Sequence, residues 1–165
     1  MISNFKSLLH ELFIMPKQQK NQPYSTVDPR IADLVEEFNT IEGVTTIASC
    51  QGHCSGRDHH PYVYFSAPIE FAAWLSEQCR ESRKDKRHYT QWEVEGVFNG
   101  ENELMFSLLS PLYRQHCLYS LYSGWWYLGW HRKRVDGELD YLKEIVMNFQ
   151  HVTHEQKSNK VSRHK

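Results

Sequence analysis

Residues 47–65 read IASCQGHCSGRDHHPYVYF, in which two apolar runs flank a polar loop. The first run ends a segment rich in β-branched residues, 44–48, and the second begins at Tyr62, so both are predicted to be strands. The loop between them holds two thiols, three imidazoles, two glycines and a guanidinium. Loops mounted on rigid elements often carry function. We therefore expect the functional site in this loop.

The segment before this stretch predicts a helix. Asp28-Pro29 is typical of a helix start, apolar residues then recur at helical spacing as far as Ile41, and Gly43 supplies a stop.

The segment after it predicts a second helix from Pro68, then strands at 89–98 and 103–109 joined by a hairpin at Asn99-Gly100. A long, aromatic-rich helix is predicted after Pro111, ending at about His151. This order of elements predicts an α+β fold, with a four-stranded, largely antiparallel sheet covered by helices and a long C-terminal helix.

The chain divides into four predicted parts. Residues 1–15 form a short amphipathic helix, and the polar, proline-containing residues 16–27 form a linker. A single domain is expected over 28–152. Residues 153–165 have no apolar pattern and are predicted to be a disordered tail.

Composition limits the classes of partner and the compartment. The 165 residues carry a formal net charge of -1, which argues against a generally basic nucleic-acid binder. Neither a secretory leader nor a membrane span is expected, so a cytoplasmic protein without membrane association is predicted. In a reducing compartment the four cysteines are metal-bound, catalytic or simple thiols rather than structural disulfides.

One interpretation of the loop is a zinc site. Cys50 and His53 have a spacing that lets them share one ion, and His59 and His60 or Cys54 could complete a tetrahedron. A structural zinc site usually has a second paired half-site, which the sequence lacks. The alternative is that the adjacent histidines are merely exposed.

A second interpretation is nucleophilic catalysis. Cys50 ends a predicted strand and is followed by a glycine turn and His53, so the pair could form a thiolate and an imidazolium. The alternative is that Cys50 is a small buried hydrophobic residue that finishes the strand.

A third interpretation is capture of a small anionic or nucleotide-like ligand. Gly52 allows backbone geometries that turn N–H groups toward an anion, and Arg57 offers a bidentate fork. Ser49 and Gln51 add hydrogen-bonding groups, and Tyr62 could flank the ligand. The alternative is a turn whose polar groups satisfy one another.

Aromatic residues crowd the predicted C-terminal helix. Trp126 and Trp130 are the candidates for a ligand wall or an interface, and the basic residues 131–134 that follow would suit phosphates. Helical spacing favours a core role for most of the other apolar residues there, so nucleic-acid binding is not the favoured interpretation.

Two motifs resemble known families. SCQGH at 49–53, followed by PYVYF at 61–65, resembles a short motif in small proteins of bacteria and their phages. CSGR at 54–57 is similar to the end of the Ser-Ser-Cys-Ser-Gly-Arg motif of the tRNA wybutosine-synthesis methyltransferase family. Gly52 and His53 replace the two serines, and the match lies beyond the predicted strand end. This second resemblance therefore implies a shared architecture rather than S-adenosylmethionine binding.

Three functions remain open from the sequence. The first is ligand binding at the loop, with or without Cys50/His53 catalysis. The second is a non-enzymatic module with a structural zinc ion. The third is an interaction protein, carried by a mobile element, that uses its aromatic C-terminal helix.

Overall fold

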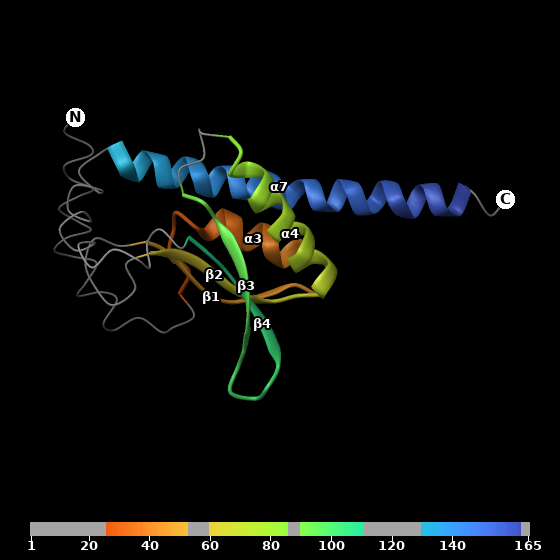
Figure 1. Ribbon diagram of the computed structural model, residues 1–165, viewed down its shortest axis with the longest axis horizontal. Coiled ribbons are helices and arrows are strands. Elements are labelled where there is room, and N and C mark those ends of the chain that lie inside the picture. The colour runs from red at the N-terminus through yellow and green to blue at the C-terminus, as the bar shows by residue number, and fades with distance from the viewer. Residues whose placement is uncertain (1–25, 53–59, 86–89, 111–129, 163–165) are drawn as a thin grey trace.

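The computed structural model describes residues 26–52, 60–85, 90–110 and 130–162 (Figure 1). In the last of these ranges, side chains are described for residues 133–149. In chain order, these residues form α3 (Ala32–Thr40), β1 (Thr45–Gln51), β2 (Pro61–Ser66), α4 (Ile69–Ser82), β3 (Glu93–Phe98), β4 (Leu104–Leu109) and α7 (Trp130–Ser162). The predicted N-terminal helix and most of the predicted linker lie outside these ranges.

The strands form one antiparallel sheet in the order β1-β2-β4-β3. All three described helices lie on the same side of it, with α7 crossing over α3 and α4 (Figure 1). The predicted α+β fold with a four-stranded antiparallel sheet and a C-terminal helix is therefore confirmed.

Alternate residues of the two central strands form the floor of the core. Val63 and Phe65 of β2 pair with Leu108 and Phe106 of β4, and all four side chains are buried. The ring of Phe38 from α3 packs edge-on against Phe65, with centroids 4.9 Å apart. This packing follows the period-two pattern of a sheet with one covered face.

The first helix begins later than the sequence predicts. Residues 29–31 form a turn, in which the Ile31 N–H donates to the Asp28 carbonyl oxygen at 3.2 Å, and α3 starts at Ala32. The Asp28 carboxylate accepts a hydrogen bond from the Gln51 N–H instead of capping the helix. Gly43, with φ of +78°, turns the chain from α3 into β1, a left-handed conformation that favours glycine.

The C-terminal helix closes the core with one apolar stripe. The members of that stripe recur at helical spacing and are buried: Val135, Leu139, Leu142, Ile145 and Val146. Ion pairs tie this helix to the start of the domain, from Asp136 to Arg30 at 2.6 Å and from Lys143 to Asp33 at 3.1 Å.

The helix also continues to Ser162, through most of the segment predicted to be a disordered tail. No glycine or proline follows Gly137 within it, so nothing in the local sequence stops the helix. Within the described ranges, none of the helices combines the length and the apolar character needed to cross a bilayer.

Candidate functional site

The first strand continues beyond its predicted end at Ala48. It pairs with β2 as far as Gln51 opposite Pro61, so three predicted site residues, Ser49, Cys50 and Gln51, lie in β1. Because successive side chains in a strand point to opposite faces, they cannot all line one site. The strand therefore divides the predicted site into two groups.

One group lies on the sheet face away from the helices. Cys50 is directly opposite Tyr62 of β2, and Tyr62 is opposite Leu109 of β4, which places the three in one row. The His60 and Tyr62 rings lie 5.8 Å apart at an interplanar angle of 47°. The structure thus gathers a thiol, a phenol and an imidazole where β1 ends and β2 begins.

Gly52 shapes the backbone beside the thiol. Its φ of +83° is in the left-handed region that glycine adopts without strain, and its N–H donates to the Cys50 Sγ at 3.3 Å. The side chain of Cys50 is only 4% exposed, yet it does not belong to the main hydrophobic cluster under the helices. The Cys50 thiol is therefore buried beside a backbone hydrogen-bond donor rather than among apolar side chains of the main cluster.

Gln51 belongs to the other group and has a structural role. Its side chain is 1% exposed, and its Oε1 accepts the Arg30 N–H at 3.0 Å. Its own N–H donates to the Asp28 carboxylate at 3.1 Å, and Arg30 reaches across to Asp136 of α7. Gln51 therefore holds the end of β1 against the turn before α3.

Sequence reasoning missed this network. The sequence predicted Asp28 only as the start of a helix. No local pattern pairs Arg30 with Asp136, which lies 106 residues away.

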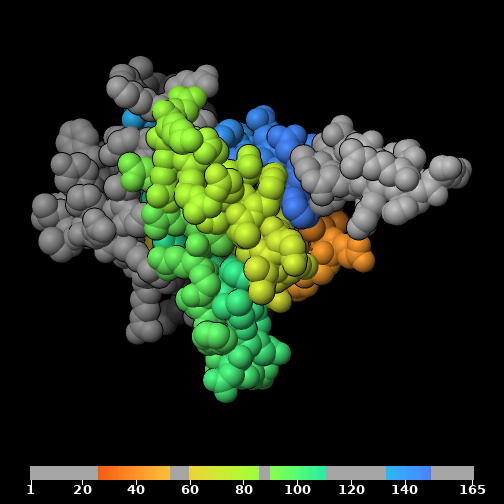
Figure 2. Space-filling view, turned by 45° about the vertical axis from the view of Figure 1, so that its right-hand side comes forward, coloured from red at the N-terminus to blue at the C-terminus, as the bar shows by residue number. Residues whose placement is uncertain are grey.

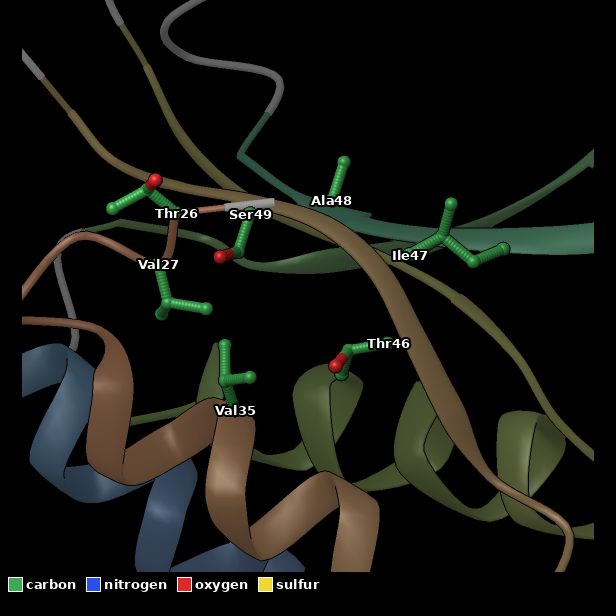
Figure 3. A pocket seen from close by; sticks show the side chains of 7 residues that line it. All are labelled: Thr26, Val27, Val35, Thr46, Ile47, Ala48 and Ser49. Atoms are coloured by element: carbon green, nitrogen blue, oxygen red, sulfur yellow. The ribbon is translucent and has the colours of Figure 1, made fainter. Parts of the chain in front are cut away.

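Ser49 opens onto a different cavity, on the helix side of β1. This pocket of about 160 Å³ is lined by Thr26, Val27, Val35, Thr46, Ile47, Ala48 and Ser49. In Figure 3 the Ser49 and Val35 side chains point toward a common space, whereas Ala48 points away from it. Cys50 is not among the lining residues, so the pocket and the thiol lie on opposite sides of the strand.

The remaining predicted residues lie outside the described part of the chain. These are His53, Arg57, His59 and Trp126, together with the side chain of Trp130, whose backbone begins α7. Among the residues that are described, no group of three or more His, Cys, Asp or Glu side chains could hold a metal ion. Only Cys50 and His60 of the predicted zinc ligands belong to that part, so the zinc site remains a prediction.

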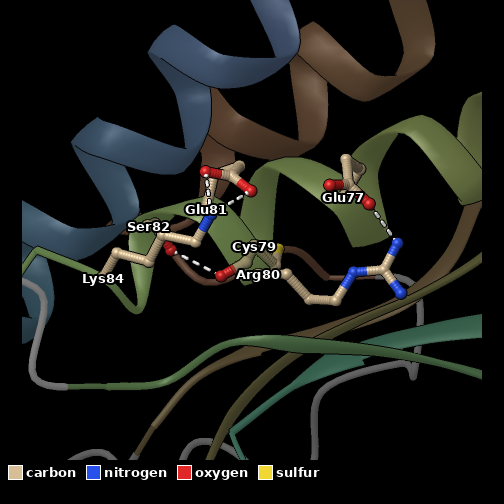
Figure 4. A network of polar contacts seen from close by, with 6 residues as sticks. All are labelled: Glu77, Cys79, Arg80, Glu81, Ser82 and Lys84. Atoms are coloured by element: carbon tan, nitrogen blue, oxygen red, sulfur yellow. Dashed lines mark hydrogen bonds and ion pairs between the residues drawn. The ribbon is translucent and has the colours of Figure 1, made fainter.

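A second thiol, that of Cys79 in α4, has a different environment. It is 1% exposed and belongs to the main hydrophobic cluster, and burial raises its pKa to about 12, with Arg83 opposing the shift and Glu93 adding to it. The Cys79 carbonyl oxygen accepts the Ser82 hydroxyl at 2.8 Å (Figure 4). This thiol stays protonated at neutral pH and serves packing.

A buried polar cluster ties the start of β3 and the end of β4 to α7. The Thr90 hydroxyl donates to the Glu138 carboxylate at 2.6 Å, and the Ser110 hydroxyl donates to the Thr90 carbonyl oxygen. Glu138 is 6% exposed. No local sequence pattern indicates this cluster, because its members come from three distant segments.

Comparison with known proteins finds no matching family model, no similar curated protein and no similar solved structure.

Proposed function

We propose that the protein binds a small anionic or nucleotide-like ligand where β1 ends and β2 begins, with the Cys50 thiol as the reactive group. The observation that carries this proposal is the meeting of Cys50, Tyr62 and His60 on the sheet face away from the helices. A thiol, a phenol and an imidazole are the groups that nucleophilic and acid–base chemistry uses.

The backbone around the thiol supports the proposal. The Gly52 N–H donates to the Cys50 sulfur at 3.3 Å, so the buried thiol has a polar backbone group beside it. His60 lies within the same group, so it is a candidate partner for Cys50 beside His53, which the sequence nominates. The Tyr62 ring offers an apolar face on which a nucleobase could stack.

The opposite side of the strand gives the site a rigid support. Gln51 is fixed by Asp28 and by the N–H of Arg30, which anchors the residue next to Cys50. A site is most precise when the elements that carry it are held by surrounding hydrogen bonds. Gln51, predicted to bind the ligand, is therefore proposed as a positioning residue.

Thermal shift with a panel of nucleotides and with inorganic phosphate tests the proposal. A ligand present at about 100 times its Kd stabilises the wild type by about 2.7 kcal/mol. We expect this stabilisation to fall in Cys50→Ala, Tyr62→Ala and Arg57→Ala, and to persist in Cys79→Ala, the control with an equally buried thiol elsewhere. Equal stabilisation of all four variants would show that the ligand does not bind where β1 ends and β2 begins.

A further inference from the structure

The β3–β4 hairpin extends beyond the part of the sheet that the helices cover. Figure 2 shows it in green, projecting from the body of the protein. Three apolar side chains near its tip are exposed: Val97 at 36%, Phe98 at 74% and Leu104 at 40%. Phe98 and Leu104 are direct cross-strand partners, so they form one apolar patch on one face of the hairpin.

The tip is rigidly built. The Asn99 Oδ1 accepts the N–H groups of Glu101 and Glu103, each at 2.9 Å, and the Asn102 N–H donates to the Asn99 carbonyl oxygen at 3.1 Å. Asn102 supplies the left-handed residue, with φ of 62°, that a three-residue hairpin loop requires. Because the tip is preformed, the hairpin itself loses little chain entropy when a partner binds.

The backbone of β3 offers hydrogen-bonding groups at the edge of the sheet. The Asn99 N–H bonds to the Glu103 carbonyl oxygen, so the pair of Val97 with Met105 is also a hydrogen-bonded pair in the alternating antiparallel pattern. The N–H and C=O groups of Gly96 and Phe98 then point outward, away from β4. Gly96 is exposed, and without a side chain its backbone is easily approached.

The opposite edge of the sheet, β1, is less accessible to strand addition than β3. A bulge interrupts β1 between Thr46 and Ala48, and the Thr46 N–H is bonded to the Asn39 side chain at 2.8 Å. In β3 the register with β4 is unbroken, and the strand has neither lysine nor proline. Bulges, lysine and proline are among the features by which natural sheets blunt an edge, and of the protecting features β3 has short length and the charges of Glu93 and Glu95.

Charge indicates what kind of chain would add to this edge. Residues 93–104 contain four glutamates and no lysine or arginine. Glu93 is paired with Arg83 of α4 at 2.7 Å, so the net negative charge of the hairpin lies with the glutamates nearer its tip. A second copy pairing through its own β3 would bring like charges together, and nucleic acids and anionic membranes would be repelled. A cationic segment of another protein is complementary.

We propose that Gly96–Phe98 is a docking edge at which an extended, lysine- or arginine-containing segment of a partner protein adds as a strand. Its apolar residues would cover Phe98 and Leu104, and its cationic residues would face the glutamates of the hairpin. This mode of recognition derives affinity from main-chain hydrogen bonds and specificity from alternate side chains.

Selection of a random linear peptide display library on the full chain tests the proposal. We expect the selected peptides to alternate apolar and cationic residues. Binding should be lost in Gly96→Pro, because proline removes an outward N–H without breaking the ladder to β4, and kept in Gly96→Ala. Phe98→Ser should weaken binding about tenfold or more, whereas Ile69→Ser, at an equally exposed apolar residue of α4, should not.

Peptides without cationic residues, or binding that survives both Gly96→Pro and Phe98→Ser, would overturn the proposal. Two further measurements can overturn it as well. Self-association of the wild type that Gly96→Pro abolishes would make the occupant a second copy, and binding to anionic vesicles that Phe98→Ser abolishes would make it a membrane.

Discussion

The end of β1 and the last turn of α4 each bury a cysteine, and the two thiols differ in almost everything except exposure. Cys79 is surrounded by the main hydrophobic cluster, which raises its pKa to about 12. Cys50 is outside that cluster, beside Tyr62, with the Gly52 N–H directed at its sulfur. Burial alone therefore does not distinguish the two thiols, whereas the groups that surround each sulfur do.

Reaction with iodoacetamide gives the largest expected contrast between the two thiols. In a Cys54→Ser/Cys117→Ser background, Cys79 should react only when the whole domain unfolds. Cys50 lies at a strand end that can open locally, so it should react on the order of 100-fold faster. A time course by peptide mass spectrometry under native conditions measures both rates. Equal rates of reaction at Cys50 and Cys79 would show that the two thiols are equally protected.

Replacing Gln51 tests whether the residue next to Cys50 supports the fold. Gln51→Ala removes the acceptor of the Arg30 N–H from a buried position, and we expect a loss of about 2 kcal/mol in the free energy of unfolding. Gln78→Ala, at a half-buried position of α4, should stay within about 0.5 kcal/mol of the wild type. Urea unfolding measures both. A neutral Gln51→Ala would return this residue to the candidates for ligand contact.

Periodicity predicted the fold because it reports burial directly. The alternation of Val63 and Phe65 marks the covered face of β2, and the helical spacing of Leu139, Leu142 and Val146 marks the buried stripe of α7. The hairpin was predicted from Asn99-Gly100, but Asn102 provides its left-handed residue. Many loop geometries are compatible with one such dipeptide.

The candidate site was predictable only in part, because residue type does not fix orientation. The sequence predicted a strand over 44–48 with Cys50 close to its end, and the structure extends the strand to Gln51. This extension places Ser49 and Gln51 on one face and Cys50 on the other, since the period is two. Contacts such as that of Arg30 with Asp136 depend on tertiary packing and leave no local pattern.

A methyl group at Gly52 probes the backbone beside Cys50. Gly52→Ala forces a left-handed conformation on a residue with a side chain, and we expect the free energy of unfolding to fall by about 1–2 kcal/mol. Gly137→Ala is the matched control, because the added carbon meets nothing within 4 Å beyond its chain neighbours and the local backbone of α7, and it should stabilise by about 0.5–1 kcal/mol. Chemical denaturation of both variants checks the opposite signs. A Gly52→Ala variant as stable as the wild type would show that the turn relaxes easily.

The smallest expected effect is the change in the free energy of unfolding at alkaline pH that is due to Cys79. Below the ordinary thiol pKa of 9.0, the folded and unfolded states both keep this proton, so its contribution to stability is complete. Above that value the unfolded state loses the proton first, and stability falls until the pH passes the folded pKa of about 12. The Cys79 contribution should be a loss of about 1 kcal/mol between about pH 9 and about pH 10.

Cys79→Ala removes that contribution without removing those of tyrosines and lysines, which titrate in the same range. Urea unfolding of the wild type and the variant at several pH values isolates it as a difference in slope, whatever the variant costs at neutral pH. The same comparison with Cys50→Ala asks whether the other thiol behaves alike. If Cys79→Ala left the pH dependence of the free energy of unfolding unchanged, the surroundings of Cys79 would not hold its thiol protonated. The proposed physical difference between the two cysteines would then be wrong for Cys79.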